Sequence, residues 1–256
     1  MIDGALDQKT IDGILSQVPS LEGLFDRVLR LSPDFISIKF PSASMVPIAA
    51  VCLKDTLHMV ADVRYALLEA HYHGIWYRRK GGINNERTAV WMERFYTDDA
   101  AFRLYAAAEH LAEAITGMME LSEADLGAYR KNRTSRQAVV GQYLVHEQSN
   151  HALGQAVATL AKALDWKTAM DYRADLVHEQ PPTIHGLGIV YKRKTRWRIA
   201  SDGKTEVLIG GSDAPDFRTD EIIKSMTRAL ELLIETFKVC LAFYEDKLRQ
   251  AGFTWS

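Results

Sequence analysis

The order of apolar and polar side chains along the chain predicts an α-helical protein. Over most of its length, apolar residues recur roughly every three or four positions, the spacing of a helix that buries one face. The clearest stripe follows Thr219, which opens a helix and is followed by two acidic residues. Its apolar members are Ile222, Met226, Leu230, Leu233, Phe237, Leu241, Tyr244 and Leu248. We therefore expect a last helix that ends near Gly252.

Two more long helices are predicted in the first half of the chain. One begins at Ser44 and reaches about Tyr77. The other begins at Thr97, which precedes two acidic residues, and follows an apolar stripe that ends at Met119. The segment 80–85 contains adjacent glycines and adjacent asparagines, so a loop is expected there.

The segment 120–182 is predicted to hold two further helices. A capping box is expected at Ser122 and Asp125, and apolar spacing over 139–164 predicts one long helix after it. A shorter helix is expected over about 166–180. It must end there because two prolines follow, and a residue before a proline is pushed out of α geometry.

The two remaining regions complete the expected architecture. Residues 1–43 are predicted to form a helical extension and linker, with two short helices interrupted at Pro19. Two β-prone runs flank an Asp-Gly pair in the segment 187–210, which predicts a β-hairpin. The expected fold is therefore all-α, an antiparallel helical bundle over residues 44–256 with the hairpin inserted before its last helix.

The composition is that of a folded domain, and the charge and the apolar stretches limit the classes of function and the cellular location that can be expected. The 256 residues are 47% hydrophobic and 25% charged, with a formal net charge of -2, which excludes a globally basic nucleic-acid coat but not a local basic patch. The first residues lack the basic flank and apolar run of a signal peptide, and no apolar stretch is long enough to cross a bilayer. We expect a cytoplasmic protein without membrane association. Cys52 and Cys240 are expected to be buried thiols.

One helix end carries two residues suited to the cleavage of RNA. Arg173 and His178 lie near the end of the short helix that precedes the prolines. A histidine titrates near neutral pH and can take the proton of a ribose 2′-hydroxyl, while a guanidinium can stabilise the charge that gathers on phosphate oxygens. Residues five apart on a regular helix point roughly 140° from one another. A bent or frayed helix end, or two protomers around a two-fold axis, would be needed to bring such groups together.

An arginine, four residues and then a histidine at the end of a bundle helix resemble the Rx4-6H motif of the HEPN superfamily. The surrounding helices, over roughly residues 98–252, are similar to its Cthe_2314-like branch. Many members are metal-independent endoribonucleases in which paired protomers bring two motifs together, whereas others are inactive. The resemblance implies that Arg173 and His178 are catalytic, in a homodimer that acts on RNA without a metal or another cofactor. A toxin or defence setting, with an antitoxin or other protein as partner, also follows from the resemblance alone. The family often has a polar residue directly after the arginine, where this chain has Ala174.

A basic run with one aromatic residue follows the motif in the predicted hairpin. Its members are Lys192, Arg193, Lys194, Arg196, Trp197 and Arg198. Cations beside a ring on which a base can stack are typical of single-stranded RNA binding. The same charges would also protect an edge strand from aggregation, so both interpretations stay open.

Other functions remain open or lack support. A chain with this many arginines and histidines contains an Arg-x4-His string by chance at about even odds, and a capping or salt-bridge role would also account for it. The alternative to an endoribonuclease or RNA-binding protein is a non-catalytic helical interaction or scaffold module. The histidines lack the Glu-x-x-His spacing of metal sites in helical bundles, so no metal site is predicted.

Overall fold

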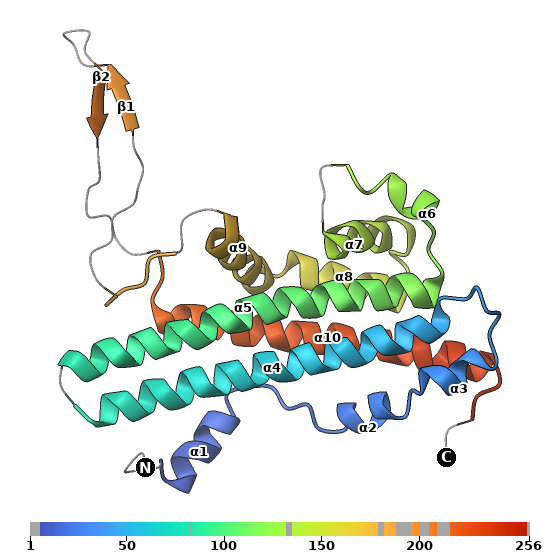
Figure 1. Cartoon of the computed structure of the whole chain (residues 1–256), viewed down its shortest axis with the longest axis horizontal. Coiled ribbons are helices and arrows are strands. Elements are labelled where there is room, and N and C mark those ends of the chain that lie inside the picture. Colours follow the sequence, from blue (N-terminus) through green and yellow to red (C-terminus); the bar gives the residue numbers. More distant parts are fainter. Residues whose placement is uncertain are drawn as a thin grey trace.

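The structure is a computed structural model dominated by long helices (Figure 1). It describes residues 6–81, 83–131, 135–178, 182–187, 196–199, 205–208 and 216–254. Helices α4 (Val46–Arg79), α5 (Ile83–Met119) and α10 (Thr219–Gln250) run the length of the molecule. No helix within the described ranges is both long and apolar enough to span a membrane.

Helices α4 and α5 form a close antiparallel pair. A Cβ atom at Gly117 would lie 2.9 Å from the carbonyl oxygen of Met45, and one at Gly74 would lie 2.1 Å from a carboxylate oxygen of Glu93. The fully buried alanines of the two helices are Ala49, Ala50, Ala66, Ala70, Ala89, Ala100, Ala101, Ala107 and Ala114. Small side chains let helix axes approach closely, so α4 and α5 contact each other along their whole length.

Helix α5 begins at Ile83, and the prediction of a helix that begins at Thr97 is therefore wrong. Thr97 is fully buried inside α5, and its hydroxyl donates a hydrogen bond of 2.7 Å to the carbonyl oxygen of Glu93. The expected loop over 80–85 is also shorter than predicted, because residues 83–85 are helical. The first turn of α5 is largely exposed, and the Asn85 amide donates a 2.6 Å hydrogen bond to the carbonyl oxygen of Gly81.

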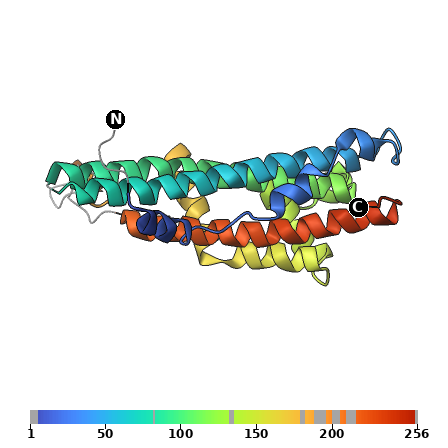
Figure 2. The same cartoon turned by 90° about the horizontal axis from the view of Figure 1, so that it is seen from below.

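Helix α10 lies between the α4–α5 pair and α8 (Figure 2). The phenol of Tyr244 donates a 2.7 Å hydrogen bond to the carbonyl oxygen of Val46, and the Lys247 ammonium donates one of 2.6 Å to that of Met118. The end of α10 thus meets the start of α4 and the end of α5. Helix α10 is antiparallel to α4, as predicted, but parallel to α5, so the bundle is not antiparallel throughout. The segment between α5 and α10 returns the chain to the other end of the bundle.

That segment contains four helices, namely α6 (Glu123–Gly127), α7 (Arg136–Glu147), α8 (Ala152–Lys162) and α9 (Leu164–His178). The predicted capping box of Ser122 and Asp125 at the start of α6 is confirmed.

The single helix predicted over 139–164 is wrong, because the chain turns between α7 and α8. The Nδ1 atom of His151 accepts a 3.2 Å hydrogen bond from the backbone N–H of Leu153 and caps α8. A Cβ atom at Gly154 would lie 2.0 Å from the carbonyl oxygen of Gln148, so the turn closes against a position that only glycine fits.

The N-terminal segment packs along α4. Its helices are α1 (Gln8–Leu15), α2 (Leu24–Leu29) and α3 (Pro33–Ser37), the first two of which match the predicted short helices. Val28, Leu31 and Ile36 are almost completely buried and belong to the same apolar core as α4, α5 and α10.

Two short antiparallel strands, β1 (Arg196–Ile199) and β2 (Thr205–Leu208), lie within the segment where the hairpin is expected. Their register pairs Arg196 with Leu208 and Ile199 with Thr205. Residues 200–204, which would form the turn, lie outside the described residues.

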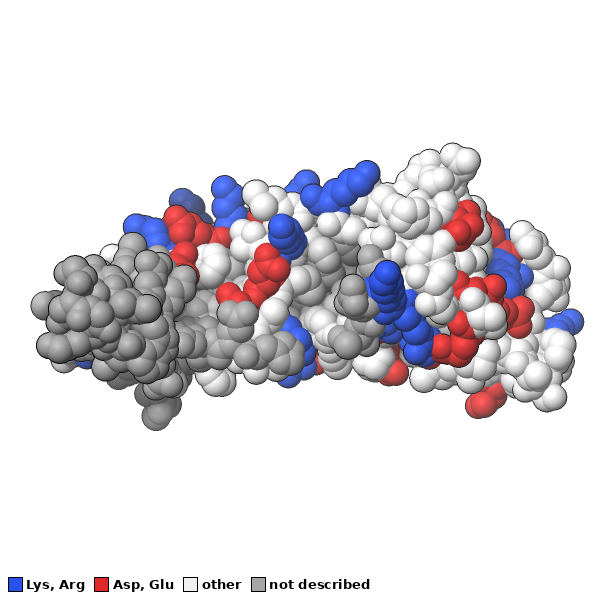
Figure 3. All heavy atoms as spheres, turned by 90° about the horizontal axis from the view of Figure 1, so that it is seen from above, with Lys and Arg blue, Asp and Glu red and all other residues white. Residues whose placement is uncertain are grey.

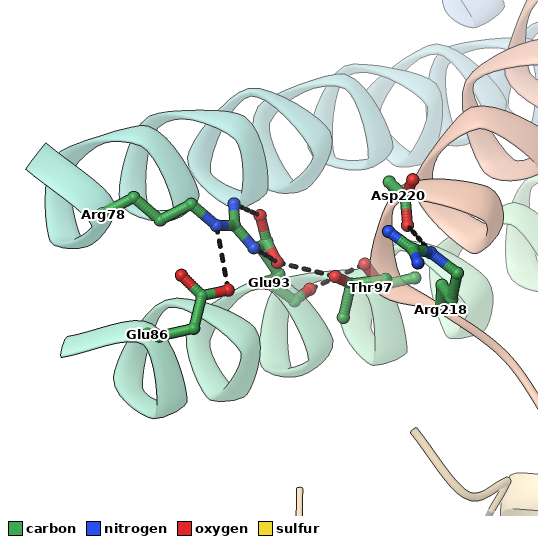
Figure 4. A network of polar contacts seen from close by, with 7 residues as sticks. Arg78, Glu86, Glu93, Thr97, Arg218 and Asp220 are labelled. Atoms are coloured by element: carbon green, nitrogen blue, oxygen red, sulfur yellow. Dashed lines mark hydrogen bonds and ion pairs between the residues drawn. The ribbon is translucent and has the colours of Figure 1, made fainter. Parts of the chain in front are cut away.

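A buried carboxylate joins α4, α5 and the start of α10 (Figure 4). Glu93 is only 6% exposed and accepts a 2.9 Å hydrogen bond from the Arg78 guanidinium and one of 2.7 Å from the Thr219 hydroxyl. Arg78 also reaches the exposed Glu86 at 3.2 Å. The hydrogen bond to Glu93 raises the pKa of Arg78. Because Gly74 has no side chain, it leaves room for this carboxylate between the helices.

The two carboxylates on Arg78 allow a matched test of this network. Glu93→Ala should lower the free energy of unfolding by about 2 kcal/mol, because the Thr219 hydroxyl and the Arg78 guanidinium lose a charged acceptor. Glu86→Ala should cost less than about 1 kcal/mol, because that pair is exposed to water. Denaturant unfolding of both variants measures the difference. Equal losses would contradict the role given to Glu93.

Candidate functional site at helix α9

Helix α9 is fixed on α5 by a buried tyrosine. The Tyr172 side chain is fully buried, and its phenol donates a 2.6 Å hydrogen bond to the Asp98 carboxylate. Arg94, one turn earlier on α5, pairs with the same carboxylate at 3.5 Å. Burial raises the pKa of Asp98 above its usual value, while the hydrogen bond from Tyr172 partly opposes that shift. Burial likewise raises the pKa of Tyr172, so the phenol stays protonated and donates.

Asp98 therefore does not serve the first turn of a helix, as the sequence suggested, but anchors α9 from the middle of α5. This anchor sets the position of the residue that follows Tyr172, which is Arg173.

The guanidinium of Arg173 lies over the ring of Tyr105, with its central carbon 4.0 Å from the ring centroid. The side chain is half-buried, and its Nε atom is buried without a hydrogen-bond partner. Arg173 makes no ion pair within the residues that the structure describes. A buried or half-buried cation normally has an acidic partner, because water no longer solvates it fully. The missing partner leaves this guanidinium able to bind an anion.

Arg173 also lines a pocket of about 430 Å³ between α5, α7, α8, α9 and α10. Most of its lining is apolar, and Ala174 lies beside Arg173 in its wall. The position that is often polar in the HEPN motif is thus occupied here by a small apolar residue at the edge of this pocket.

The second residue of the predicted pair is described only by its backbone. His178 is the last residue of α9, and its side chain lies outside the described part of the structure. The prediction that Arg173 and His178 form one site therefore stays a prediction. The expected end of the helix before Pro181 is compatible with the observed end of α9 at His178.

The predicted RNA-binding run is described only in small part. Lys192, Arg193 and Lys194 lie outside the described residues. Arg196, Trp197 and Arg198 belong to β1, and only their backbone is described. In Figure 1 the strands β1 and β2 stand away from α9. The side-chain arrangement expected for the run stays a prediction.

Charge on the face above α5 and α9 is mixed. In Figure 3, the coloured Lys and Arg side chains of this face are interspersed with Asp and Glu. Arg130 pairs with Glu123, and Arg136 pairs with Glu113. The Glu109 carboxylate accepts hydrogen bonds from the first backbone N–H groups of α7, at 3.0 and 3.3 Å. That helix N-terminus is therefore already occupied by an anion from the chain itself.

The geometry of the described residues gives little support to metal binding or to a cysteine nucleophile. Within the described ranges, no group of three or more His, Cys, Asp or Glu side chains is placed to hold a metal ion. Cys52 and Cys240 are buried free thiols, and burial raises the pKa of Cys52 to about 11 and that of Cys240 further still. Thiols with raised pKa values are poor nucleophiles near neutral pH.

Sequence reasoning missed the residues that position Arg173. The apolar spacing after Thr97 places Tyr105 in the buried stripe of its helix, and Asp98 is expected to be a carboxylate in the first turn. The sequence suggests no contact for Tyr172. The spacing between Asp98 and Tyr105, seven residues or two helical turns, places them on one face of α5. The spacing indicates a contact with Tyr172 and Arg173 only once α9 is known to lie across that face of α5.

Comparisons of the chain with family models, with curated proteins and with solved structures give no match.

The anchor of α9 is testable with a phenylalanine substitution. Tyr172→Phe should lower the free energy of unfolding by about 2 kcal/mol, because a half-buried carboxylate loses its hydrogen-bond donor. The loss should be largest above the pKa of Asp98, where the carboxylate is charged, and should shrink as the pH falls through that pKa.

Tyr105→Phe is the matched control, because it keeps the ring beneath Arg173 and removes a hydroxyl without a hydrogen bond in the described part of the chain. It should change stability by no more than about 0.5 kcal/mol. Chemical denaturation at several pH values measures both variants. A pH-independent loss in Tyr172→Phe would contradict the proposed hydrogen bond to a charged Asp98.

Proposed function

We propose that this protein is a HEPN-like endoribonuclease that binds RNA and cleaves it without a metal ion. The proposal rests chiefly on Arg173, a half-buried guanidinium that has no acidic partner within the described residues and lies five residues before the end of α9. A phosphate group is a natural partner for such a guanidinium, since two parallel N–H groups can bind two phosphate oxygens. The resemblance to the Rx4-6H motif adds the histidine at the helix end.

The proposed reaction uses the RNA's own 2′-hydroxyl as nucleophile. His178 takes the proton of this hydroxyl, and the oxygen attacks the neighbouring phosphorus. Arg173 stabilises the negative charge that gathers on the phosphate oxygens during the attack. The bond from phosphorus to the 5′-oxygen breaks, and the 5′-oxygen takes up a proton. The products are a 2′,3′-cyclic phosphate and a 5′-hydroxyl end, and no cofactor is consumed.

A homodimer completes the proposed site. Residues five apart on one helix diverge, so Arg173 of one protomer and His178 of a second copy converge more easily than the two residues of one chain. The basic run from Lys192 to Arg198 is the proposed RNA-binding segment, with Trp197 as a ring on which a base stacks. A toxin or defence role, in the cytoplasm and with an antitoxin as partner, belongs to the same proposal.

A second candidate is a non-catalytic helical module that binds a partner and cleaves nothing. Two observations favour it. The guanidinium of Arg173 is stacked on Tyr105, and Ala174 replaces the polar residue that is common in the motif. In that case Arg173 contributes a cation to a binding surface and His178 has no chemical role.

RNA cleavage by the full chain separates the two candidates. A labelled single-stranded RNA is incubated with the protein in excess chelator, beside Arg173→Gln and His178→Ala. The proposal predicts cleavage by the wild type and a fall of roughly 100-fold or more in each variant. It also predicts a 2′,3′-cyclic phosphate on the product.

Arg228→Gln and His146→Ala are the matched controls, because these side chains are exposed on other helices. Both should cleave like the wild type. Cleavage that persists in Arg173→Gln or His178→Ala, or that chelator abolishes, would contradict the proposed site. Binding of RNA without cleavage by any preparation would favour the non-catalytic module.

A further inference from the structure

The pocket beside Arg173 has the size of a small-molecule site. Its volume is about 430 Å³, within the range of roughly 300–1,000 Å³ that is usual for such sites. Five helices contribute to its wall, namely α5, α7, α8, α9 and α10. The lining also includes the exposed residues Ala161 and Lys167, so the pocket opens to the surface (the helices that form it are labelled in Figure 1).

The far walls of the pocket are hydrocarbon. Val140 and Leu144 of α7, Leu160 of α8 and Leu233 of α10 line it and are themselves buried. Such a wall attracts an apolar ligand, because burial removes its hydrocarbon surface from water.

The charged residues that line the pocket are both cations. Lys167 and Arg173 come from α9, and among the described residues no Asp or Glu belongs to the lining. Neither cation forms an ion pair within those residues, and the Nε atom of Arg173 is buried without a partner. The pocket therefore has an apolar end and a cationic side with unfilled hydrogen-bonding capacity.

Two of the polar side chains of the lining already have partners, and Ser135 and Gln142 also belong to the lining. The Thr236 hydroxyl donates to the carbonyl oxygen of its own helix at Leu232, 2.9 Å away. The amide of Gln137 faces the sulfur of Met170 at 4.0 Å. The chemistry of the lining favours a ligand with one anionic group and a hydrocarbon body.

We infer that this pocket binds a small organic anion with an apolar body, for which a straight-chain carboxylate is the simplest example. The carboxylate accepts hydrogen bonds from Arg173 and lies near Lys167, while the hydrocarbon chain contacts the aliphatic walls from α7, α8 and α10. Such a ligand supplies the acidic partner that Arg173 lacks. The inference does not rest on RNA cleavage.

Titration calorimetry with octanoate tests this inference on the full chain. The neutral octanamide has the same hydrocarbon body and is the matched probe. Octanoate should bind saturably at one site, and octanamide should bind at least about tenfold more weakly, because it lacks the charge that Arg173 and Lys167 complement. No saturable binding of octanoate, or equal binding of both probes, would overturn the inference.

Three variants locate the binding in the pocket. Arg173→Gln should weaken octanoate binding by at least about tenfold, whereas Arg173→Lys should keep part of it because the charge remains. Ala161→Trp places a large ring at an exposed position of the lining and should also weaken binding. Lys162→Gln removes an exposed cation of α8 that does not line the pocket, and should bind like the wild type. Unchanged binding in both Arg173→Gln and Ala161→Trp would place octanoate elsewhere and overturn the inference.

The outcome is separable from that of the cleavage experiment. His178→Ala should bind octanoate like the wild type, even though it should not cleave RNA. Octanoate binding without RNA cleavage would leave the pocket assignment intact and remove the proposed nuclease. RNA cleavage without octanoate binding would support the proposed nuclease and overturn the pocket assignment.

Discussion

The close contact between α4 and α5 is the constraint on which the rest of the structure depends. Fully buried alanines and two glycines let the helices approach, and Gly74 leaves room for the buried carboxylate of Glu93. Because Arg78 and Thr219 both bind this carboxylate, the same contact sets where α10 begins. At the other end, Tyr244 and Lys247 bind carbonyl oxygens of α4 and α5. The three long helices therefore hold one another at both ends.

This frame determines the environment of Arg173. Helix α9 crosses α5 where Asp98 receives the phenol of Tyr172, and the next residue of α9 is then directed onto Tyr105. The turn at Gly154 folds α8 back beside α7, so both helices and α10 enclose apolar space next to the guanidinium. An arginine that is stacked on a ring, and that has no acidic partner among the described residues, is thus a consequence of how α9 is docked. The proposed binding of an anion follows from this position more directly than from the spacing of the motif.

The helical bundle could be predicted from the sequence, because a long apolar stripe indicates a helix that buries one face against other helices. The capping box at Ser122 and the start of α10 at Thr219 were also predictable, since such signals act within one turn. The start of α5 was not, because the contacts made there join α5 to the end of α4 and the turn after it: Asn85 binds the carbonyl oxygen of Gly81, and Glu86 pairs with Arg78. The turn between α7 and α8 was missed because it depends on Gly154 meeting a backbone carbonyl from the preceding turn. The aromatic and acidic residues around Arg173 could not be assigned either, because their roles arise only from contacts between helices distant in sequence.

The central claim is that the Arg173 guanidinium is free to bind an anionic group of RNA. Nitrogen-edited NMR of the arginine Nε–H groups tests it most directly, with Arg173→Lys used to assign the signal. Titration with a short single-stranded RNA should shift the Arg173 signal saturably, because phosphate oxygens replace the missing acidic partner. If the RNA binds and shifts other arginine signals while that of Arg173 stays unchanged, the claim is contradicted.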